Sequence, residues 1–331
     1  MTDAPERDVS DQPLDDGILP FRVEPLSVRG RVVRLGPAID AIFARHAYPN
    51  VVNHALGEAA ALAVLLGSVV KGGGRFQLQT KTDGPIGMIL VDYDSPSNVR
   101  ALARFDAQRV AAMKSHNVGE ALGLGHMAFT FDPGGDMARY QGVVAVEGQG
   151  FEAAAHDYFL RSEQIPTSVR LAVGRVVTKD GESWRAGGLL AQFLPSAPQR
   201  MRQPDFAPGD APEGAAPQEG FVEDEAWLEA KAHVGTVEDH ELLDPTLSSE
   251  RLLHRLFHER GVRVNEATRL LDVCRCSDDG VEAMLRSFPA ADRAAMVGDD
   301  GLIAVTCEFC SRKRTYAPDA LRSADGDDSA V

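Results

Sequence analysis

Apolar and polar side chains alternate along several short segments between residues 21 and 195. The clearest is Phe76-Gln77-Leu78-Gln79, where every second side chain is apolar, as in a half-buried strand. Alanine, leucine and valine at helical spacing predict a buried helix over residues 50–70, and residues 151–161 form a second predicted helix. The strands cluster without regular alternation with helices, so we expect an α+β fold with a mainly antiparallel sheet. Strands are predicted at residues 21–33, 76–79, 88–91, 127–131, 143–146 and 168–177.

The pattern changes after residue 195. Residues 196–220 are rich in proline, alanine and glycine, which predicts a flexible loop. Residues 221–264 have a helical pattern, within which Asp244-Pro245 has the form of a helix start. One apolar stripe is made by Leu252, Leu253, Leu256 and Phe257. We therefore expect a helical linker region that packs this stripe on a β-rich N-terminal core domain of residues 19–195.

Acidic residues dominate both ends of the chain and its total charge. Residues 1–18 and 320–331 are predicted to be disordered acidic tails. A formal net charge of -15 makes nucleic acid and anionic membranes unfavourable partners. The most apolar stretch, Ala59 to Val70, is too short to span a bilayer, and the first residues lack the apolar run of a signal peptide. We expect a cytoplasmic protein, whose thiols are normally reduced.

All the cysteines lie in a predicted small C-terminal domain of residues 265–319. They form a C-x-C pair, Cys274 and Cys276, and a C-x-x-C pair, Cys307 and Cys310. Two close pairs in a reducing compartment are typical of a tetrahedral metal site, and zinc is the expected ion. Four thiolates leave no open position for a substrate, so the predicted site is structural and holds one Zn²⁺ per chain in the reduced state.

Oxidation of such a site favours the loss of its metal, because thiolates are the form of cysteine that oxidants attack. Disulfides are expected within the pairs, Cys274 with Cys276 and Cys307 with Cys310. Zinc ties the two pairs together, whereas these disulfides tie each pair only to itself. The lost crosslink constrains the unfolded chain by about 3–4 kcal/mol. The pattern therefore predicts a switch that unfolds the C-terminal domain when it is oxidised.

Other features of the sequence allow more than one interpretation. Arg275, Arg312, Lys313 and Arg314 either offset the charge of a four-thiolate centre or form a solvated basic rim. His254 and His258 share a helix face, and a solvated face is favoured over a metal role because the cysteine shell is already complete. Gly72-Gly73-Gly74 favours a turn, since no phosphate-binding motif includes it.

Two competing functions have weak support in the sequence. The C-x-x-C pair is compatible with a thiol–disulfide oxidoreductase, but no thioredoxin-like βαβ pattern surrounds it. Arg312-Lys313-Arg314 is compatible with a zinc-ribbon nucleic-acid binder, which the net charge opposes.

Several segments together resemble the heat-shock protein 33 family, the redox-regulated 33 kDa chaperonins. Besides the two cysteine pairs, the resemblance is carried by Lys71-Gly72 with Arg75 to Gln79, Asp83 to Gly87, Tyr140 to Val144, Ser162 to Thr167 and Leu252 to Glu259. It spans roughly residues 21–319. The sequence departs from the family pattern at Ser277 to Gly280, which lacks a basic residue, and at Leu271 to Val273, which lacks an aromatic one.

The resemblance implies a non-enzymatic, ATP-independent holdase that binds unfolded or partially folded client proteins. It implies that oxidation releases zinc, unfolds the C-terminal domain, destabilises the linker and favours a homodimer. It also implies that Cys274, Cys276, Cys307 and Cys310 are both the zinc ligands and the redox sensors.

Overall fold

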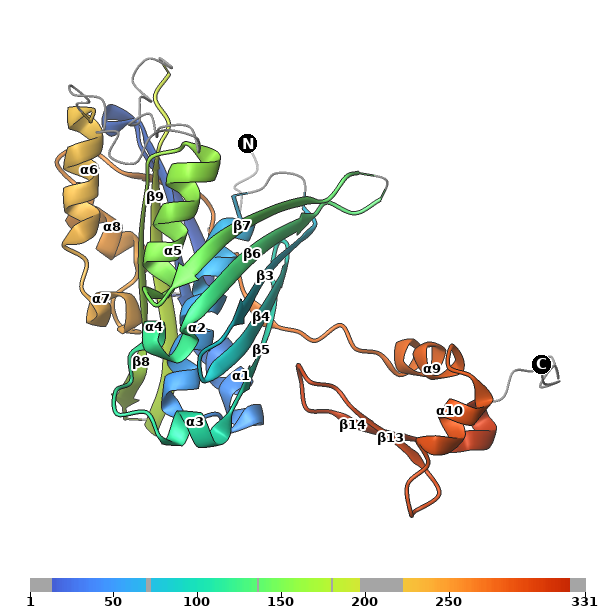
Figure 1. Ribbon diagram of the computed structural model, residues 1–331. Coiled ribbons are helices and arrows are strands. Elements are labelled where there is room, and N and C mark those ends of the chain that lie inside the picture. The colour runs from blue at the N-terminus through green and yellow to red at the C-terminus, as the bar shows by residue number, and fades with distance from the viewer. Residues whose placement is uncertain (1–13, 70–72, 136, 180, 197–222, 322–331) are drawn as a thin grey trace, which may run out of the picture. The chain divides into compact units, whose positions relative to one another are not determined.

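The computed structural model describes residues 14–69, 73–135, 137–179, 181–196 and 223–321 (Figure 1). Its contacts divide the chain into two compact units, Met1–Asp272 and Val273–Val331. The first unit contains two six-stranded sheets together with helices. The predicted α+β class is therefore confirmed, although the strands form two sheets where the sequence pattern suggested one.

The first sheet has the strand order β10-β1-β2-β9-β8, with β11 also paired to β1, and all its pairs are antiparallel. Residues 21–33 were predicted to form a single strand, which is wrong. A helical turn, η1 (Glu24–Leu26), divides them, because Pro25 favours the start of a helical turn and Ser27 adopts a left-handed φ of 54°. The bounds are β1 Asp16–Val23, β2 Val28–Leu35, β8 Thr167–Thr178, β9 Gly181–Phe193, β10 Arg263–Val264 and β11 Thr268–Arg269.

The second sheet has the strand order β12-β5-β4-β3-β6-β7. Its pairs are antiparallel except for β12, which runs parallel to β5. Phe76 and Leu78 are buried while Gln77 and Gln79 are not, so the predicted alternation is confirmed. The bounds are β3 Arg75–Thr82, β4 Ile86–Asp94, β5 Asn98–Phe105, β6 Leu124–Asp132, β7 Tyr140–Glu147 and β12 Leu271–Asp272.

Helix α2 (Asn50–Gly67) lies between the two sheets and contacts strands of both. By length and composition it could cross a membrane, so the expectation that every apolar stretch is too short is wrong: the helix begins at Asn50, upstream of Ala59. In this fold 83% of the helix is buried, as in the core helices of soluble proteins. Around it lie α1 Pro37–His46, α3 Ala107–Ala111, α4 Val118–Leu122, α5 Gly150–Tyr158 and the π-helical turn η2 Phe159–Glu163.

Three helices cover the other face of the first sheet: α6 (Glu225–Gly235), α7 (Asp239–Leu243) and α8 (Ser249–Phe257), in yellow and orange in Figure 1. The predicted stripe of α8 is fully buried there, with Leu252 and Leu253 at 0% exposure. Phe257 stacks on Phe21 of β1, with ring centroids 5.9 Å apart. The prediction that this helix packs on the core domain is confirmed.

Asp244-Pro245 does not start a helix, contrary to the sequence prediction. The Asp244 side chain accepts a hydrogen bond from the Thr246 amide at 2.8 Å and forms a turn at the end of α7. The cap of α8 is Ser248, whose hydroxyl accepts from the Arg251 amide at 3.2 Å.

Arg34 of β2 fastens the α7–α8 segment to the first sheet. Its buried guanidinium donates to the carbonyl oxygens of Leu242 at 3.1 Å, Asp244 at 2.9 Å and Glu241 at 2.9 Å. It also donates to the hydroxyl of Ser249 at 3.2 Å. Burial lowers the pKa of Arg34, while the carboxylates of Asp15 and Asp244 raise it. One cation therefore satisfies the carbonyl groups at the end of α7 and the first residue of α8.

The expected segment boundaries differ from the structure at two places. Asp16 to Ile18 were expected in the disordered tail but belong to β1, because the Asp16 carboxylate accepts hydrogen bonds from the amides of Gly36 and Ala38 at the start of α1. The expected start of the C-terminal domain, residue 265, lies in a stretch that pairs with β1 and β5 as β10, β11 and β12. Residues 1–13, 197–222 and 322–331, and with them nearly all of the expected loop and tails, lie outside the described residues.

Candidate metal centre

The second unit has a very small apolar core. Among its described residues, the cluster of buried apolar side chains consists of Leu285, Ile303 and Leu321. A module with so little buried surface needs a further source of stability, and a metal is a common one. Its elements are α9 Asp278–Arg286, α10 Ala290–Ala295, β13 Ile303–Thr306, β14 Lys313–Tyr316 and the short helix η4 Pro318–Leu321.

The second cysteine pair occupies the turn between β13 and β14. The amide of Cys307 donates to the carbonyl of Arg312 at 3.0 Å, and the amide of Ser311 donates back to Cys307 at 2.8 Å. Ser311 takes a left-handed φ of 55°, which closes the turn. The hairpin thus holds Cys307 and Cys310 on one tight loop.

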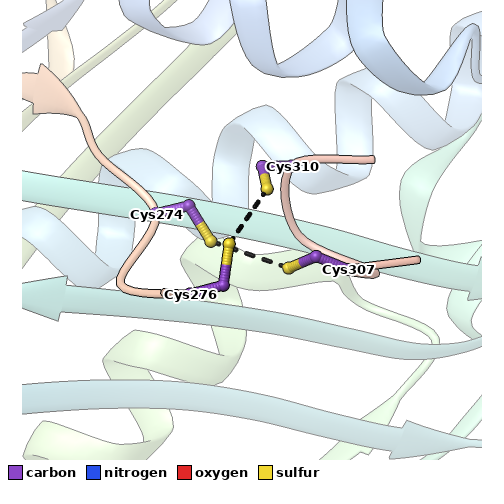
Figure 2. Close-up of side chains that lie close together, drawn as sticks. All are labelled: Cys274, Cys276, Cys307 and Cys310. Carbon is purple, nitrogen blue, oxygen red and sulfur yellow. Dashed lines mark hydrogen bonds between the residues drawn. The ribbon is translucent and has the colours of Figure 1, made fainter. Parts of the chain in front are cut away.

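The first pair lies between β12 and α9, where Ser277 ends the cysteine segment by capping α9. Its hydroxyl accepts from the amide of Gly280 at 3.0 Å. The two segments bring the four sulfur atoms together, as Figure 2 shows, and all four lie within 4.8 Å of one another. The sulfurs of Cys274 and Cys307 are 3.7 Å apart, and those of Cys276 and Cys310 are 3.4 Å apart.

These distances fit a tetrahedral zinc ion. A Zn–S bond of about 2.3 Å places sulfur atoms about 3.8 Å apart in a tetrahedron. The four cysteines form no disulfide and are half-buried, so their sulfur atoms are available as ligands. The structure therefore brings together all four predicted site residues in a geometry that suits the predicted metal.

Arg314 of β14 lies against this cluster. Its side chain is 5% exposed, and its guanidinium donates to the sulfur of Cys276 at 3.5 Å and to the carbonyl of the same residue at 3.2 Å. It also pairs with Asp278. Arg312 and Lys313 are exposed instead. Of these three basic residues, Arg314 offsets thiolate charge, and the other two fit a solvated rim.

Two of the thiols differ in acidity. Burial opposes ionisation of Cys276, but hydrogen bonds from Cys310, Cys274 and Arg314 outweigh it and lower its pKa to about 7. Burial raises the pKa of Cys310 to about 12, and its bonds to the other sulfurs add to this rise. Without a metal, Cys276 is thus more readily ionised than Cys310 and more ready to act as a thiolate nucleophile.

A further residue of this region could not be found from the sequence. Asp272, two residues before Cys274, is held by Arg45 of α1, whose Nη2 atom donates to Oδ1 at 2.8 Å. The amide of Leu271 donates to the carbonyl of Ser97 at 2.8 Å. These bonds fix β12, the strand that leads into the first cysteine pair. An acidic residue near a cysteine is a visible signal, but nothing in the sequence pairs it with Arg45.

The other candidates of the sequence lie elsewhere. His254 and His258 are on α8, in the first unit and outside the cysteine cluster. Gly73 and Gly74 have φ values of 78° and 115° just before β3, as expected of a turn, while Gly72 lies outside the described residues.

Comparison with known proteins agrees with this architecture. The family model described as Hsp33 protein matches residues 16–317. A 33 kDa chaperonin of Caulobacter vibrioides is 44% identical over 317 residues, covering 94% of this chain and 97% of its own. A 33 kDa chaperonin of Ectopseudomonas mendocina is 32% identical over 301 residues, covering 91% of each chain.

Among solved structures, the crystal structure of the 33 kDa chaperonin of Thermotoga maritima (heat shock protein 33 homolog) has the same fold. The TM-score is 0.70 at 19% sequence identity, with 93% of this chain and 96% of that chain covered. The family model spans both cysteine pairs, and the two chaperonin relatives each match more than nine-tenths of the chain. This chain belongs to the Hsp33 family.

Proposed function

We propose that this protein is a redox-switched, ATP-independent holdase whose four cysteines bind one Zn²⁺ in the reduced state. Family membership supports the chaperone role itself. The observation that carries the switch is the meeting of four sulfur atoms within 4.8 Å in a unit whose core has three buried side chains. A bound Zn²⁺ would crosslink the two cysteine pairs and supply the stability that this core lacks.

Oxidation removes the ligands. Within each pair, the two thiols lose two protons and two electrons and form one disulfide, and one hydrogen peroxide is reduced to two waters. The expected pairs are Cys274 with Cys276 and Cys307 with Cys310. Each disulfide then links neighbours only, so no crosslink joins the two segments, and the second unit, which begins at Val273, is expected to unfold.

The linker helices cover an apolar sheet face that could serve as a surface for clients. Phe21, Leu189 and Phe193 on the outer face of the first sheet are buried under α6–α8, and Phe193 packs against Trp227 at 6.1 Å. If the linker loosens after oxidation, this apolar face is uncovered and can bind apolar segments of unfolded or partially folded proteins. A homodimer is the expected oxidised form, and the cytoplasm the expected compartment.

Aggregation of a heat-unfolding test protein, followed by light scattering, tests the proposal. Peroxide-treated, zinc-free protein should keep the test protein soluble, and reduced zinc-loaded protein should not. Zinc measured with a chromogenic chelator should fall from about one per chain to none. Equal protection by both forms would contradict the proposed switch. Reduced protein that contains no zinc would contradict the proposed metal site.

A variant with Cys274→Ser and Cys276→Ser makes the test independent of peroxide. It lacks half of the ligands, so its second unit should be unfolded and the protein should protect clients even in reducing buffer. Treated protein that is reduced again with zinc present is the control, and it should lose its protection. Peptide mapping of the treated protein should find the two within-pair disulfides; disulfides between the pairs would keep the long tether and contradict the mechanism.

A further inference from the structure

The solvent-facing side of α8 carries a hollow of about 380 Å³. It is lined by Arg251, His254, Arg255 and His258, which lie opposite the buried apolar stripe of the same helix. The cysteine site uses none of these side chains. What the hollow can bind depends on the positions and charges of these four groups.

The two imidazoles are arranged as a pair. His254 and His258 are one helical turn apart, and their rings stack with centroids 5.5 Å apart and planes 25° from parallel. Two histidines at positions i and i+4 of a helix form a recurrent metal-binding pair, because both rings project from the same face. The helix beneath them is held rigid, since Leu253 and Phe257 are buried in the first unit.

The charges around the two imidazole rings determine whether the hollow favours a cation or an anion. Arg255 is paired with Glu241 at 2.7 Å, so its charge is compensated. Among the described residues no carboxylate forms an ion pair with Arg251. An anion in the hollow would therefore gain a single uncompensated cation. A metal ion would gain two imidazole nitrogens and the favourable end of the helix dipole, because both histidines lie at the C-terminal end of α8.

We propose that His254 and His258 form a second metal site, for a divalent ion of the imidazole-binding class such as Zn²⁺ or Ni²⁺. Two protein ligands leave the remaining positions to water, so this site is weaker than a four-thiolate site and exchanges its ion freely. Arg251 reduces its affinity by charge repulsion.

An ion bound at this pair would tie together the last turns of α8. This consequence rests on the proposed function, in which the linker has to loosen before clients bind. Free zinc at the histidine pair would then hold the linker closed and oppose activation, because an ion that binds only the folded helix stabilises it.

Calorimetric titration of tag-free, reduced, zinc-loaded protein with NiCl₂ tests the site directly. The wild type should bind Ni²⁺ saturably, and the variant His254→Asn with His258→Asn should lose that binding. Arg251→Gln should bind about threefold to tenfold more tightly, because one positive charge near the ion is removed. His240→Asn is the matched control, since His240 is an exposed histidine on α7, and it should bind like the wild type.

Equal binding by the double variant would overturn the proposal. So would phosphate binding that disappears in Arg251→Gln without any Ni²⁺ binding, which would make the hollow an anion site. Hydrogen exchange measured with and without Ni²⁺ tests the consequence: amides of residues 252–257 should be protected by the ion only when both histidines are present. This readout needs no chaperone activity, so its failure is distinct from a failure of the proposed function.

Discussion

The guanidinium of Arg314 donates to the sulfur of Cys276 at 3.5 Å, inside the smaller of the two units. This bond is one of those that lower the pKa of Cys276 to about 7. The contact links the acidity of one thiol to a buried cation on the neighbouring hairpin. The reactivity of Cys276 therefore depends on a residue other than cysteine.

Replacing this cation should make the switch slower. In Arg314→Gln the pKa of Cys276 should rise from about 7, and a rise of about one unit would slow alkylation of the zinc-free protein at pH 7 roughly fivefold, because the thiolate fraction falls from about one-half to about one-tenth. Mass spectrometry of iodoacetamide-treated protein measures this rate at each cysteine. Arg312→Gln, which removes an exposed charge from the same strand region, should leave the rate unchanged. Equal rates in the two variants would contradict the assigned role of Arg314.

Replacing Arg34, which fastens α7 and α8 to the first sheet, should loosen the linker helices. Arg34→Met leaves the carbonyls of Glu241, Leu242 and Asp244 without their donor, and we expect a loss of about 2–4 kcal/mol in the free energy of unfolding. Urea unfolding followed by tryptophan fluorescence, from Trp184 on β9 and Trp227 on α6, measures this loss. Arg29→Met on the exposed face of the same strand is the control and should change the free energy little. A variant as stable as the wild type would show that the hydrogen bonds of Arg34 contribute nothing to the free energy of unfolding.

The ion pair between Arg45 and Asp272 of β12 should contribute less to the free energy of unfolding than the hydrogen bonds of Arg34. Arg45 and Asp272 are about one-quarter and one-seventh exposed, at 28% and 14%, so we expect a coupling energy of about 1 kcal/mol. A double-mutant cycle of Arg45→Ala and Asp272→Ala, measured by urea unfolding, gives this value. Exchange of the Leu271 amide should quicken in both single variants, because β12 loses its anchor. Additive effects of the two substitutions would argue against the pair.

The free energy of unfolding should fall as the pH rises from about 4.5 to about 8, because the buried carboxyl group of Glu58 on α2 titrates differently in the folded and unfolded states. Burial, and then the carboxylates of Glu152 and Asp239, raise the pKa of Glu58 to about 8 from its ordinary value of 4.5. The folded state therefore holds a proton that the unfolded state has released. The resulting penalty begins near pH 4.5, grows with pH and is complete above about pH 8.

Glu58→Gln should remove this dependence. The variant should gain roughly 1–3 kcal/mol over the wild type at pH 8 and little at pH 4.5. Urea denaturation across this pH range measures the difference, with the exposed Glu120→Gln as the control. A constant difference at all pH values would mean that Glu58 does not titrate in this window.

Local patterns in the sequence predict local structure well in this protein. The cysteine spacing marked all four sulfurs that meet, because each close pair comes from one short segment. The alternation at Phe76 to Gln79 and the stripe of α8 predicted a strand and a buried helix face, because each depends on the period of a single element. These features needed no knowledge of distant residues.

Contacts between distant residues could not be predicted in the same way. Arg34 stands in an apolar strand pattern, and its partners at Leu242 and Asp244 lie more than two hundred residues away, with separations of 208 and 210. The Asp16 carboxylate looked like part of an acidic tail, yet it binds amides at the start of α1. The division into two sheets depends on α2 packing between them, which no single period in the sequence encodes.

The order of pairing in the first sheet has a consequence for synthesis on the ribosome. Strand β2 pairs with β1 on one side and with β9 on the other, so the second partner of Val28, Phe193, is synthesised much later than the first, Val23. The outer edge of β1 is closed only when residues 263–269 emerge, and α6–α8 emerge just before them. Between the synthesis of β9 and that of α8 the nascent chain therefore exposes the apolar face of its first sheet, and newly made copies need protection from one another until the linker helices are complete.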